Sequence, residues 1–434
     1  MKALQHDFFD THNSGHVDAQ LSPNLLKDEL SRFSEFGKQT IVNSNSTIVN
    51  ASNNETFHIS YYINEFWTAK QRAAHSIHEI SYRACFKPQL PRFFIERLTS
   101  PKDMVYDPFM GRGTTIIEAA LLGRTPAGCD VNPLSQVIVR PRLEPPDIND
   151  IEKRLRTIDF DSPQDIPDDL LVFYHPRTLQ HICALRNYLL HKAGNKSLDK
   201  VDRWIQMVAI NRLTGHSRGF FSVYTMPPNQ AVSVETQRKI NSQRNQSPDE
   251  RNISAIILKK TKSLQKDLTR TDLERLTSAS LRSLLLTGQS SNTPDIPSES
   301  VSLVVTSPPF LDVVDYAGDN WLRCWFLGID AQSLAITMSR KLADWMNNMT
   351  AVLKEVCRVL KPGGYVAFEV GEVRGGKVRL EEAVVPCGIS AGLGPVLVLI
   401  NDQKFTKTAN CWGVDNNSKG TNTNRIIVFQ KPPT

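Results

Sequence analysis

The alternation of apolar and polar positions predicts a strand, a helix and a second strand in the first third of the chain. Apolar residues recur at helical spacing over residues 90–98, which predicts a helix there. Short apolar runs at 104–106 and 126–130 are expected to be strands. A further helix is expected between these strands, and its apolar face carries Ile116, Ile117, Ala120 and Leu121.

Start and stop signals bound this helix. Gly111 and Gly113 predict a tight turn after the first strand, and Gly123 is expected to end the helix. Thr115 and Glu118 have the spacing of a capping box, in which both side chains satisfy open N–H groups at a helix start. An acidic residue ends the second strand. The order strand, glycine turn, helix, strand and acid is typical of the first half of a doubly wound α/β fold.

The apolar pattern returns after a long, charge-rich interval. Residues 344–360 have the spacing of an amphipathic helix. The run at 301–305 is almost continuously apolar, which is typical of a parallel strand buried on both faces. The last two apolar runs are expected to form an antiparallel pair at the edge of the sheet. The predicted strands of this half are residues 284–286, 301–305, 365–370, 395–400 and 425–429.

The chain has 434 residues, which is more than one ordinary core, so we expect an α/β core with a second lobe. Residues 1–56 are predicted to be a polar arm, flexible or in an edge strand, with a short repeat (TIVNSNS, TIVNASN). The core is expected in two parts, 57–140 and 281–434. A βαβ unit takes about 30 residues, so roughly 100–140 residues are inserted between the parts. We assign residues 141–280 to this mostly helical insertion.

Composition excludes several classes of protein. There is no apolar run of about 18 residues that would predict a transmembrane helix, and the N-terminus lacks the apolar core of a signal peptide. The seven cysteines form no CxxC pair and no metal-ligand spacing, so we expect a reduced, cytoplasmic protein without a metal. The net charge of +6 permits an anionic partner without requiring one.

The string DPFMGRGTT, residues 107–115, is the first candidate for chemistry. Glycines at a strand-to-helix turn let the backbone approach a ligand closely. The string lacks the Lys-Ser/Thr of a P-loop and the third glycine of the dinucleotide motif. Asp107 suits a cationic amino group better than a pyrophosphate, and Asp130 is placed to bind ribose hydroxyls. S-adenosylmethionine carries both features, whereas the alternative interpretation is a tight turn alone.

The string TSPPF, residues 306–310, follows a predicted buried strand and so lies at the carboxyl edge of the sheet, where such folds bind ligands. The Ser307 side chain and the Pro308 carbonyl can each accept a hydrogen bond from one planar NH₂ group. Pro309 fixes the turn, and Phe310 offers a face on which a planar ring can stack. The alternative is a simple strand stop at two prolines.

Together the two strings resemble the S-adenosylmethionine-dependent DNA amino-methyltransferases, over roughly residues 80–135 and 280–430. The segment RACFKPQL, residues 83–90, is similar to the family segment that closes over the methionine end of the cofactor. The resemblance implies a Rossmann-like class I methyltransferase sheet and a base that is flipped out of the duplex. Serine at the first motif position favours cytosine-N4 enzymes, and Asp or Asn is more frequent in adenine-N6 enzymes.

The resemblance also assigns site residues. The residues expected to transfer the methyl group are Ser307, Pro308, Pro309 and Phe310. The residues expected to bind the cofactor are Lys87, Pro88, Asp107, Pro108, Phe109, Gly111, Gly113, Thr114, Thr115, Asp130 and Gln289. Gln289 stands where the family often has an acid, and it is expected to hydrogen-bond adenine without adding charge.

The inserted region is predicted to recognise DNA. Residues 203–266 contain eleven basic and three acidic residues, and such a local excess is typical of phosphate contact. The predicted DNA contacts are Arg212, Arg218, Arg238, Lys239 and Arg244. In the alternative interpretation the interleaved aromatic residues are core and the bases form a solvated face.

The sequence leaves several functions and partners open. The leading prediction is a site-specific DNA cytosine-N4 methyltransferase acting on double-stranded DNA without a membrane or a metal. The alternatives are an adenine-N6 DNA enzyme, an RNA base-amine enzyme, and a catalytically idle nucleic-acid-binding protein. A homodimer and a cognate restriction enzyme are further partners that the sequence neither requires nor excludes.

Overall fold

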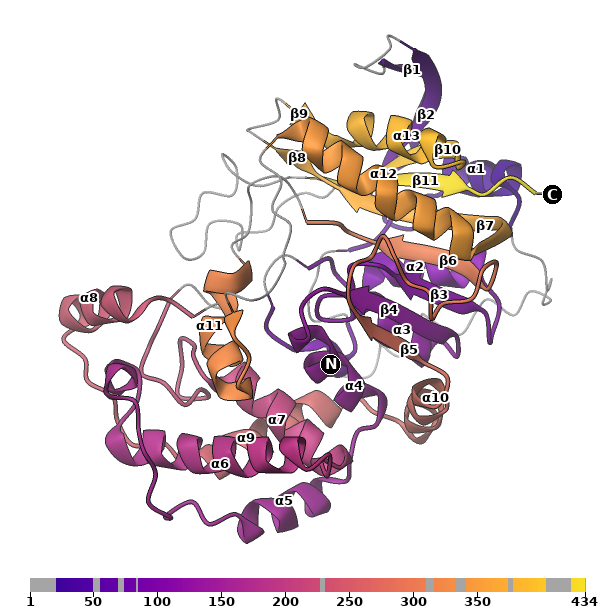
Figure 1. The fold of residues 1–434 in the computed structure, drawn as a ribbon. Helices are drawn as coiled ribbons and strands as arrows, with labels where there is room; N and C mark the ends of the chain where they lie inside the picture. Colours follow the sequence, from indigo (N-terminus) through magenta and orange to yellow (C-terminus); the bar gives the residue numbers. More distant parts are fainter. Residues whose placement is uncertain are drawn as a thin grey trace.

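The computed structural model describes residues 21–49, 55–68, 74–82, 85–226, 231–309, 316–331, 341–373, 378–402 and 423–433. In this part of the chain, nine strands form one sheet in the order β1-β2-β10-β11-β7-β6-β3-β4-β5. Helices cover both faces of the sheet, and a helical lobe lies beside it (Figure 1). The α/β fold predicted from the sequence is therefore confirmed.

The strands β5, β4, β3, β6 and β7 are parallel neighbours, whereas β11 runs antiparallel to both β7 and β10. The strands of the sheet are β1 (Ile41–Val49), β2 (Thr56–Asn64), β3 (Met104–Asp107), β4 (Thr125–Asp130), β5 (Leu284–Thr287), β6 (Val301–Thr306), β7 (Leu360–Val370), β10 (Gly394–Asp402) and β11 (Thr423–Gln430). A separate ribbon pairs β8 (Glu372–Val373) with β9 (Val378–Arg379).

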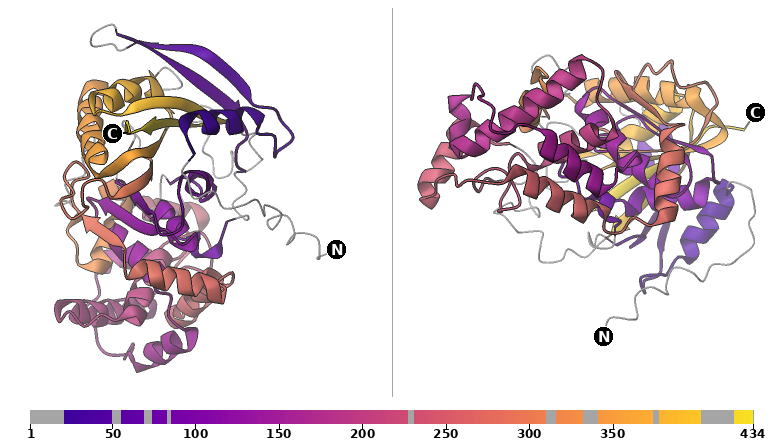
Figure 2. Two further views of the ribbon diagram at one scale, coloured as in Figure 1. Left: turned by 90° about the vertical axis from the view of Figure 1, so that its right-hand side faces the viewer. Right: turned by 90° about the horizontal axis from the view of Figure 1, so that it is seen from below.

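The predicted antiparallel pair of late strands exists as β10 and β11, but its predicted place at the sheet edge is wrong. Strand β2 pairs with β10 in parallel, and β1 then pairs with β2 and ends the sheet. Both strands project from that end of the sheet (Figure 2). The apolar pattern of β10 marked it as buried, but that pattern carries no information about a neighbour more than 300 residues away in the chain.

Two layers of helices flank the sheet. Leu26 of α1 and Phe94 of α2 lie in a buried cluster on one face, together with Val305 of β6. Leu353 of α12 and Val384 of α13 lie in a second cluster on the opposite face. The helices of these layers are α1 (Pro23–Arg32), α2 (Gln89–Leu98), α12 (Leu342–Val359) and α13 (Leu380–Ser390).

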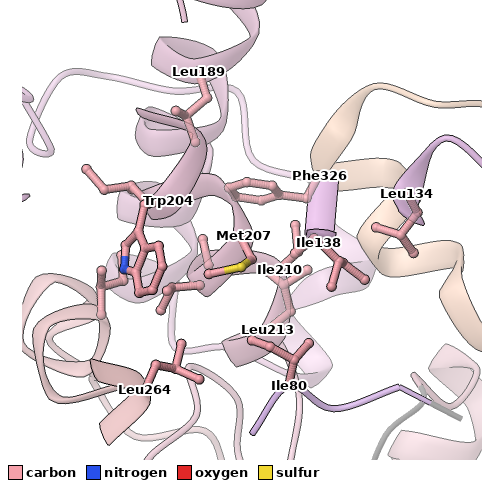
Figure 3. Packing of buried hydrophobic residues seen from close by; sticks show 14 of the residues in the cluster. Ile80, Leu134, Ile138, Leu189, Trp204, Met207, Ile210, Leu213, Leu264 and Phe326 are labelled. Carbon is pink, nitrogen blue, oxygen red and sulfur yellow. The ribbon is translucent and has the colours of Figure 1, made fainter. Parts of the chain in front are cut away.

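The helical lobe is formed mainly by the chain between β4 and β5. Figure 3 shows part of its core, in which Trp204, Met207, Ile210 and Phe326 pack together. The helices of this interval are α4 (Leu134–Leu143), α5 (Ile148–Thr157), η3 (Asp168–Val172), α6 (Pro176–Gly194), α7 (Lys200–Arg212), α8 (Val234–Arg244), α9 (Ile253–Gln265) and α10 (Arg270–Ser280). Phe326 belongs to α11 (Tyr316–Leu327), which follows β6, so a second segment of the chain completes the lobe.

Helix α3 (Thr114–Leu121) has the apolar face and the Gly123 stop that the sequence predicts, but the predicted capping box is wrong. The residue before the helix is Gly113, and no side chain caps it. The Thr115 hydroxyl instead donates to the Val305 carbonyl at 3.0 Å, and Glu118 accepts from other parts of the chain. Both side chains are buried, so they bond to neighbouring elements rather than to the helix end.

None of the helices in the described part of the chain has the length and apolarity needed to span a bilayer.

Candidate active site

The two candidate strings meet at the point where the strand order reverses. Asp107 ends β3, and Ser307 directly follows β6, which is the parallel neighbour of β3. From β3 the chain proceeds through β4 to β5, and then returns to β6 on the other side of β3. Ligands of open α/β sheets bind outside the carboxyl ends of the strands at such a switch point.

A buried hydrogen-bond network joins the two strings. The Thr306 hydroxyl donates to Asp107 Oδ1 at 2.6 Å, and the Phe109 N–H donates to the same oxygen at 3.0 Å. Asp107 is only 1% exposed, and burial raises the pKa of its carboxyl to about 7. The Asp107 side chain therefore positions the end of β6 relative to the glycine turn.

The glycine turn brings backbone N–H groups to the sheet edge. Gly111 and Gly113 have φ angles of 46° and 74°, in the left-handed region that favours glycine. A Cβ atom on Gly113 would lie 2.4 Å from Cγ2 of Val139, so α4 leaves no room for a side chain. The Gly111 N–H donates to Asp130 Oδ2 at 2.8 Å. The turn thus holds the carboxylate at the end of β4.

Asp130 is held from both sides but keeps acceptor capacity. The Asn132 N–H donates to Asp130 Oδ1 at 2.8 Å, while Gly111 binds the other oxygen. Burial raises the pKa of the Asp130 carboxyl, and these two N–H donors oppose that rise. A carboxylate can accept about four hydrogen bonds, so Asp130 keeps acceptor capacity for a ligand beyond these two N–H donors.

A cavity of about 170 Å³ lies at this edge of the sheet. Residues of both strings line it, together with the chain after β4, the loop after β5 and the first half of α12. The lining residues are Tyr82, Phe109, Gly111, Asp130, Val131, Asn132, Gln289, Ser290, Ser291, Ser307, Pro309, Trp345, Asn348, Met349, Ala351 and Val352.

Six of the predicted site residues line this cavity: Phe109, Gly111, Asp130, Gln289, Ser307 and Pro309. The other predicted catalytic and cofactor-binding residues that the structure describes are not among the lining residues. The Pro108 carbonyl accepts a hydrogen bond from the Ser290 hydroxyl, and Arg112 donates to Thr114 Oγ1 at 3.1 Å. Phe310 lies outside the described residues.

Lys87 and Pro88 lie just before α2, where Pro88 is the residue that precedes the helix. Burial lowers the pKa of the Lys87 ammonium, and the neighbouring Arg112 guanidinium lowers it further. Neither Lys87 nor Pro88 is among the residues that line the cavity in the described part of the chain.

Sequence reasoning missed Glu369, a buried acid beside Ser307. Glu369 is the residue before the last of the predicted strand YVAFEV on β7, and its side chain is 7% exposed. Burial raises the pKa of its carboxyl, and hydrogen bonds from the Ser307 hydroxyl and from Asn424 oppose that rise. The Asn424 amide donates to Glu369 Oε1 at 2.7 Å. A carboxylate is unexpected in an otherwise apolar buried strand, and this departure from the pattern could have marked Glu369 as a candidate site residue.

Sequence reasoning also missed the contribution of α12. Trp345 and Met349 were expected only as parts of an amphipathic apolar face, yet both line the cavity as well. The Trp345 indole N–H donates to the Pro309 carbonyl at 2.9 Å. The hydrophobic pattern cannot distinguish an aromatic ring that only packs from one that also binds a turn 36 residues earlier in the chain.

The predicted DNA contacts lie in the helical lobe. Arg238, Lys239 and Arg244 are on α8, which is far from the sheet in Figure 1. Arg238 pairs with Asp169 at 3.3 Å, and the Arg244 guanidinium lies 3.8 Å from the centre of the Tyr224 ring.

Of the two further predicted contacts, Arg212 is the last residue of α7, and Arg218 lies between α7 and α8. Arg212 is half-buried over the Phe220 ring at 4.0 Å, which indicates a packing role. Arg218 is exposed and lies 3.6 Å from Asp249. An exposed ion pair of this kind is weak in water, so the Arg218 side chain can exchange its partner.

Comparison with known proteins agrees with this site. Residues 25–137, which include the glycine turn, match the model of a family described as DNA methylase. The Type II methyltransferase M.MjaII of Methanocaldococcus jannaschii is 34% identical over 86 residues, which are 20% of this chain and 16% of that protein. M.BsoBI of Geobacillus stearothermophilus is 22% identical over 303 residues, or 63% of this chain and 57% of that protein.

A third Type II methyltransferase, M.MvaI of Kocuria varians, is 27% identical over 128 residues, or 29% of this chain and 25% of that protein. The alignments therefore span between 16% and 57% of the length of these relatives. The chain is thus similar, over part of its length, to a DNA methylase family and to Type II methyltransferases, and its sheet order and glycine turn agree with that similarity.

Proposed function

We propose that the protein transfers a methyl group from S-adenosylmethionine to the exocyclic N4 amine of a cytosine in DNA. One observation carries the proposal: Ser307 of the TSPPF string and Asp130 beyond the glycine turn line the same cavity. A cofactor held at Asp130 and an amine held at Ser307 would then share one enclosure, as direct transfer between them requires.

The residues present fit the cofactor of the family. Asp130 keeps acceptor capacity for a ribose hydroxyl, and Gln289 can bind an adenine edge through its amide. Phe109 and Val131 add apolar surface to the same wall. When bound, S-adenosylmethionine supplies a methyl group on a positively charged sulfur, which is already a good leaving group.

The protein's own part in the transfer centres on the Ser307 hydroxyl. The Glu369 carboxylate can accept the Ser307 proton, and the Ser307 oxygen then keeps its lone pairs for the cavity. An exocyclic amine could donate one hydrogen to this oxygen and the other to the Pro308 carbonyl. Both bonds favour a more tetrahedral nitrogen with an available lone pair, so they stabilise the transition state more than the planar ground state.

The target base has to leave the duplex to reach this cavity. Tyr82 and Trp345 place two aromatic rings in the wall, which suits a planar base. Phe310 was predicted to stack on the base and keeps that role as a proposal. The helical insertion, residues 141–280, is proposed to hold the surrounding DNA.

The choice between bases rests on Ser307. Serine at this position favours cytosine-N4 over adenine-N6 transfer within the family that the chain resembles. The names of the matched relatives state methyltransferase activity and do not state the base. Adenine-N6 transfer in DNA is therefore the second candidate.

The test is to incubate the full chain with methyl-labelled cofactor and mixed-sequence DNA, digest the DNA and separate the nucleosides. We expect label in N4-methylcytosine, whereas label in N6-methyladenine would support the second candidate. Ser307→Ala should bind the cofactor normally and lose most of the turnover. Label on RNA alone, or on no nucleic acid, would overturn the proposal.

A further inference from the structure

The Pro-Pro turn after β6 has few means of being held in place. Neither Pro308 nor Pro309 has an N–H group, so neither can donate a backbone hydrogen bond. The φ angle of each is set by its ring at about −65°, but ψ remains free. The turn can be fixed only through its carbonyl groups and the side chains around it.

Two contacts supply that restraint. At the start of the turn, the Ser307 hydroxyl bonds to the buried Glu369. At its far side, the Trp345 indole N–H donates to the Pro309 carbonyl at 2.9 Å. Because the ring of Pro309 sets φ, fixing its carbonyl oxygen restrains the remaining torsion ψ. The Trp345 bond therefore completes the restraint of the turn.

Trp345 is itself held firmly. It lies in the first turn of α12, and its side chain is only 2% exposed. Further along α12, Met349 and Leu353 are buried in the core against the sheet. Near the end of the helix, Glu355 accepts from both the N–H and the hydroxyl of Thr293 at 2.8 Å. The helix is thus tied to the loop that supplies Gln289 to the cavity.

We propose that Trp345 is a positioning residue for methyl transfer, acting through the Pro309 carbonyl. Its hydrogen bond keeps the Ser307–Pro309 turn in the one conformation in which the Ser307 oxygen and the Pro308 carbonyl can bind the amine together. The inference rests on the proposed function. The bond accounts for a tryptophan, rather than any other large apolar residue, at this position of an apolar helix face.

The test compares two tryptophan variants of the full chain. Trp345→Phe keeps an aromatic ring and removes the N–H donor. Trp204→Phe is the matched control, because Trp204 is also buried and its indole N–H donates to Thr261 at 3.0 Å inside the helical lobe. Turnover, the KM for DNA and the Kd for S-adenosylmethionine are measured for both, together with the thermal midpoint.

We expect Trp345→Phe to lower kcat by about ten- to a hundredfold, the range in which loss of positioning falls. The KM and the cofactor Kd should stay within about twofold of the wild type. Trp204→Phe should lower the thermal midpoint about as much as Trp345→Phe does, but it should leave kcat unchanged. An unchanged kcat in Trp345→Phe, or an equal loss in both variants, would overturn the inference.

A double-mutant cycle gives a second measurement. Pro309→Ala frees the φ angle at this position. The ring of Pro309, which sets φ, and the Trp345 hydrogen bond, which restrains ψ, should fix the turn jointly. We expect the effects of Trp345→Phe and Pro309→Ala on kcat to be non-additive, and strictly additive effects would contradict the inference. A wild-type chain that methylates no nucleic acid would overturn the proposed function itself, and this inference with it.

Discussion

At the scale of single residues, the contact between Ser307 and Glu369 determines where the serine proton points. A carboxylate can only accept, so the hydroxyl donates to Glu369 and turns its lone pairs elsewhere. A serine without this partner could rotate and donate into the cavity, where it would compete with the amine hydrogens. In the proposed mechanism, Glu369 is therefore the residue that makes Ser307 an acceptor.

Replacing Glu369 with Gln is expected to change activity and stability in opposite directions. The amide has no charge to orient the Ser307 proton, so kcat should fall by about tenfold or more. Burial raises the folded-state pKa of Glu369 above the ordinary 4.5, so its contribution to stability is present below that value. This contribution is lost as the pH rises through the folded pKa, which makes the charged form a cost at pH 7. Glu369→Gln should therefore raise the thermal midpoint at pH 7.

The measurements are kcat and the thermal midpoint between pH 5 and 8. The acid limb of kcat in the wild type should lie above the pH of an ordinary carboxyl, and Glu369→Gln should lack it. Glu382 is a suitable control, since it is an exposed acid whose side chain pairs with Arg379 at 3.5 Å. Wild-type turnover in Glu369→Gln would show that Glu369 has no role in the methyl transfer.

At the scale of elements, Glu118 joins three helices below the glycine turn. Its carboxylate accepts from Arg92 of α2 at 3.0 Å and lies 2.7 Å from His78 of η2 (Ser76–His78), while Glu118 itself belongs to α3. Burial lowers the pKa of His78 to about 4, so the imidazole is neutral at pH 7. The segment before α2 is thereby fastened to the helix that begins within the DPFMGRGTT string.

Glu118→Ala should destabilise the protein by about 2 kcal/mol, because it leaves His78 and Arg92 without their buried acceptor. Glu96→Ala is the matched control, since Glu96 pairs with the same Arg92 at 3.2 Å but in solvent. That pair should contribute under about 0.5 kcal/mol. Urea denaturation at pH 7 measures both variants, and equal losses would refute the role of burial.

The stability that the buried His78 contributes depends on pH. The folded pKa of His78, about 4, lies below its ordinary 6.5, so the contribution of His78 to the free energy of unfolding is fully present above pH 6.5. It is lost as the pH falls toward 4. Glu118 opposes the fall in the pKa of His78, so the stability lost across that interval should be at least as large in Glu118→Ala as in the wild type.

Element by element, the sequence predicted what repeats locally and missed what depends on distant contacts. The unit from β3 to β4 follows from spacing, glycines and a terminal acid, and the structure contains it. The pairing of β2 with β10 and the contact of Trp345 with Pro309 join segments that no local pattern connects. The capping box failed for the same reason, because Thr115 and Glu118 are satisfied by tertiary partners.

At the scale of the whole molecule, the chain passes from the candidate active site directly into the helical lobe. Helix α11 is the first described element after the TSPPF string, and it packs against α6. The Arg186 guanidinium donates to the Trp325 carbonyl at 2.9 Å, and the Trp321 indole donates to the Val232 carbonyl at 3.3 Å. A lobe that holds DNA would thus be connected by a short segment to the turn that holds the base.

Neutralising α8 tests whether this lobe binds DNA. We expect Arg238→Gln, Lys239→Gln and Arg244→Gln together to weaken DNA binding uniformly across sequences. If all three contact phosphates, the slope of log K against log salt should fall by about 2 to 3. Arg238 and Arg244 have protein partners, Asp169 and Tyr224, but both contacts are at the surface and can be exchanged for phosphate.

The control is a second triple variant with the same change in net charge, placed on α5 and α10 instead of α8. Lys153 and Arg156 on α5 and Arg270 on α10 are exposed and pair with acids on their own helices. Changing these three to Gln lowers the net charge equally, so it corrects for the general attraction of a basic protein to DNA. A loss confined to the α8 triple locates the contact, whereas equal losses in both triples would show that α8 has no special role. Unchanged binding in both would move the DNA to another face of the molecule, and the cofactor Kd should be unaffected in every case.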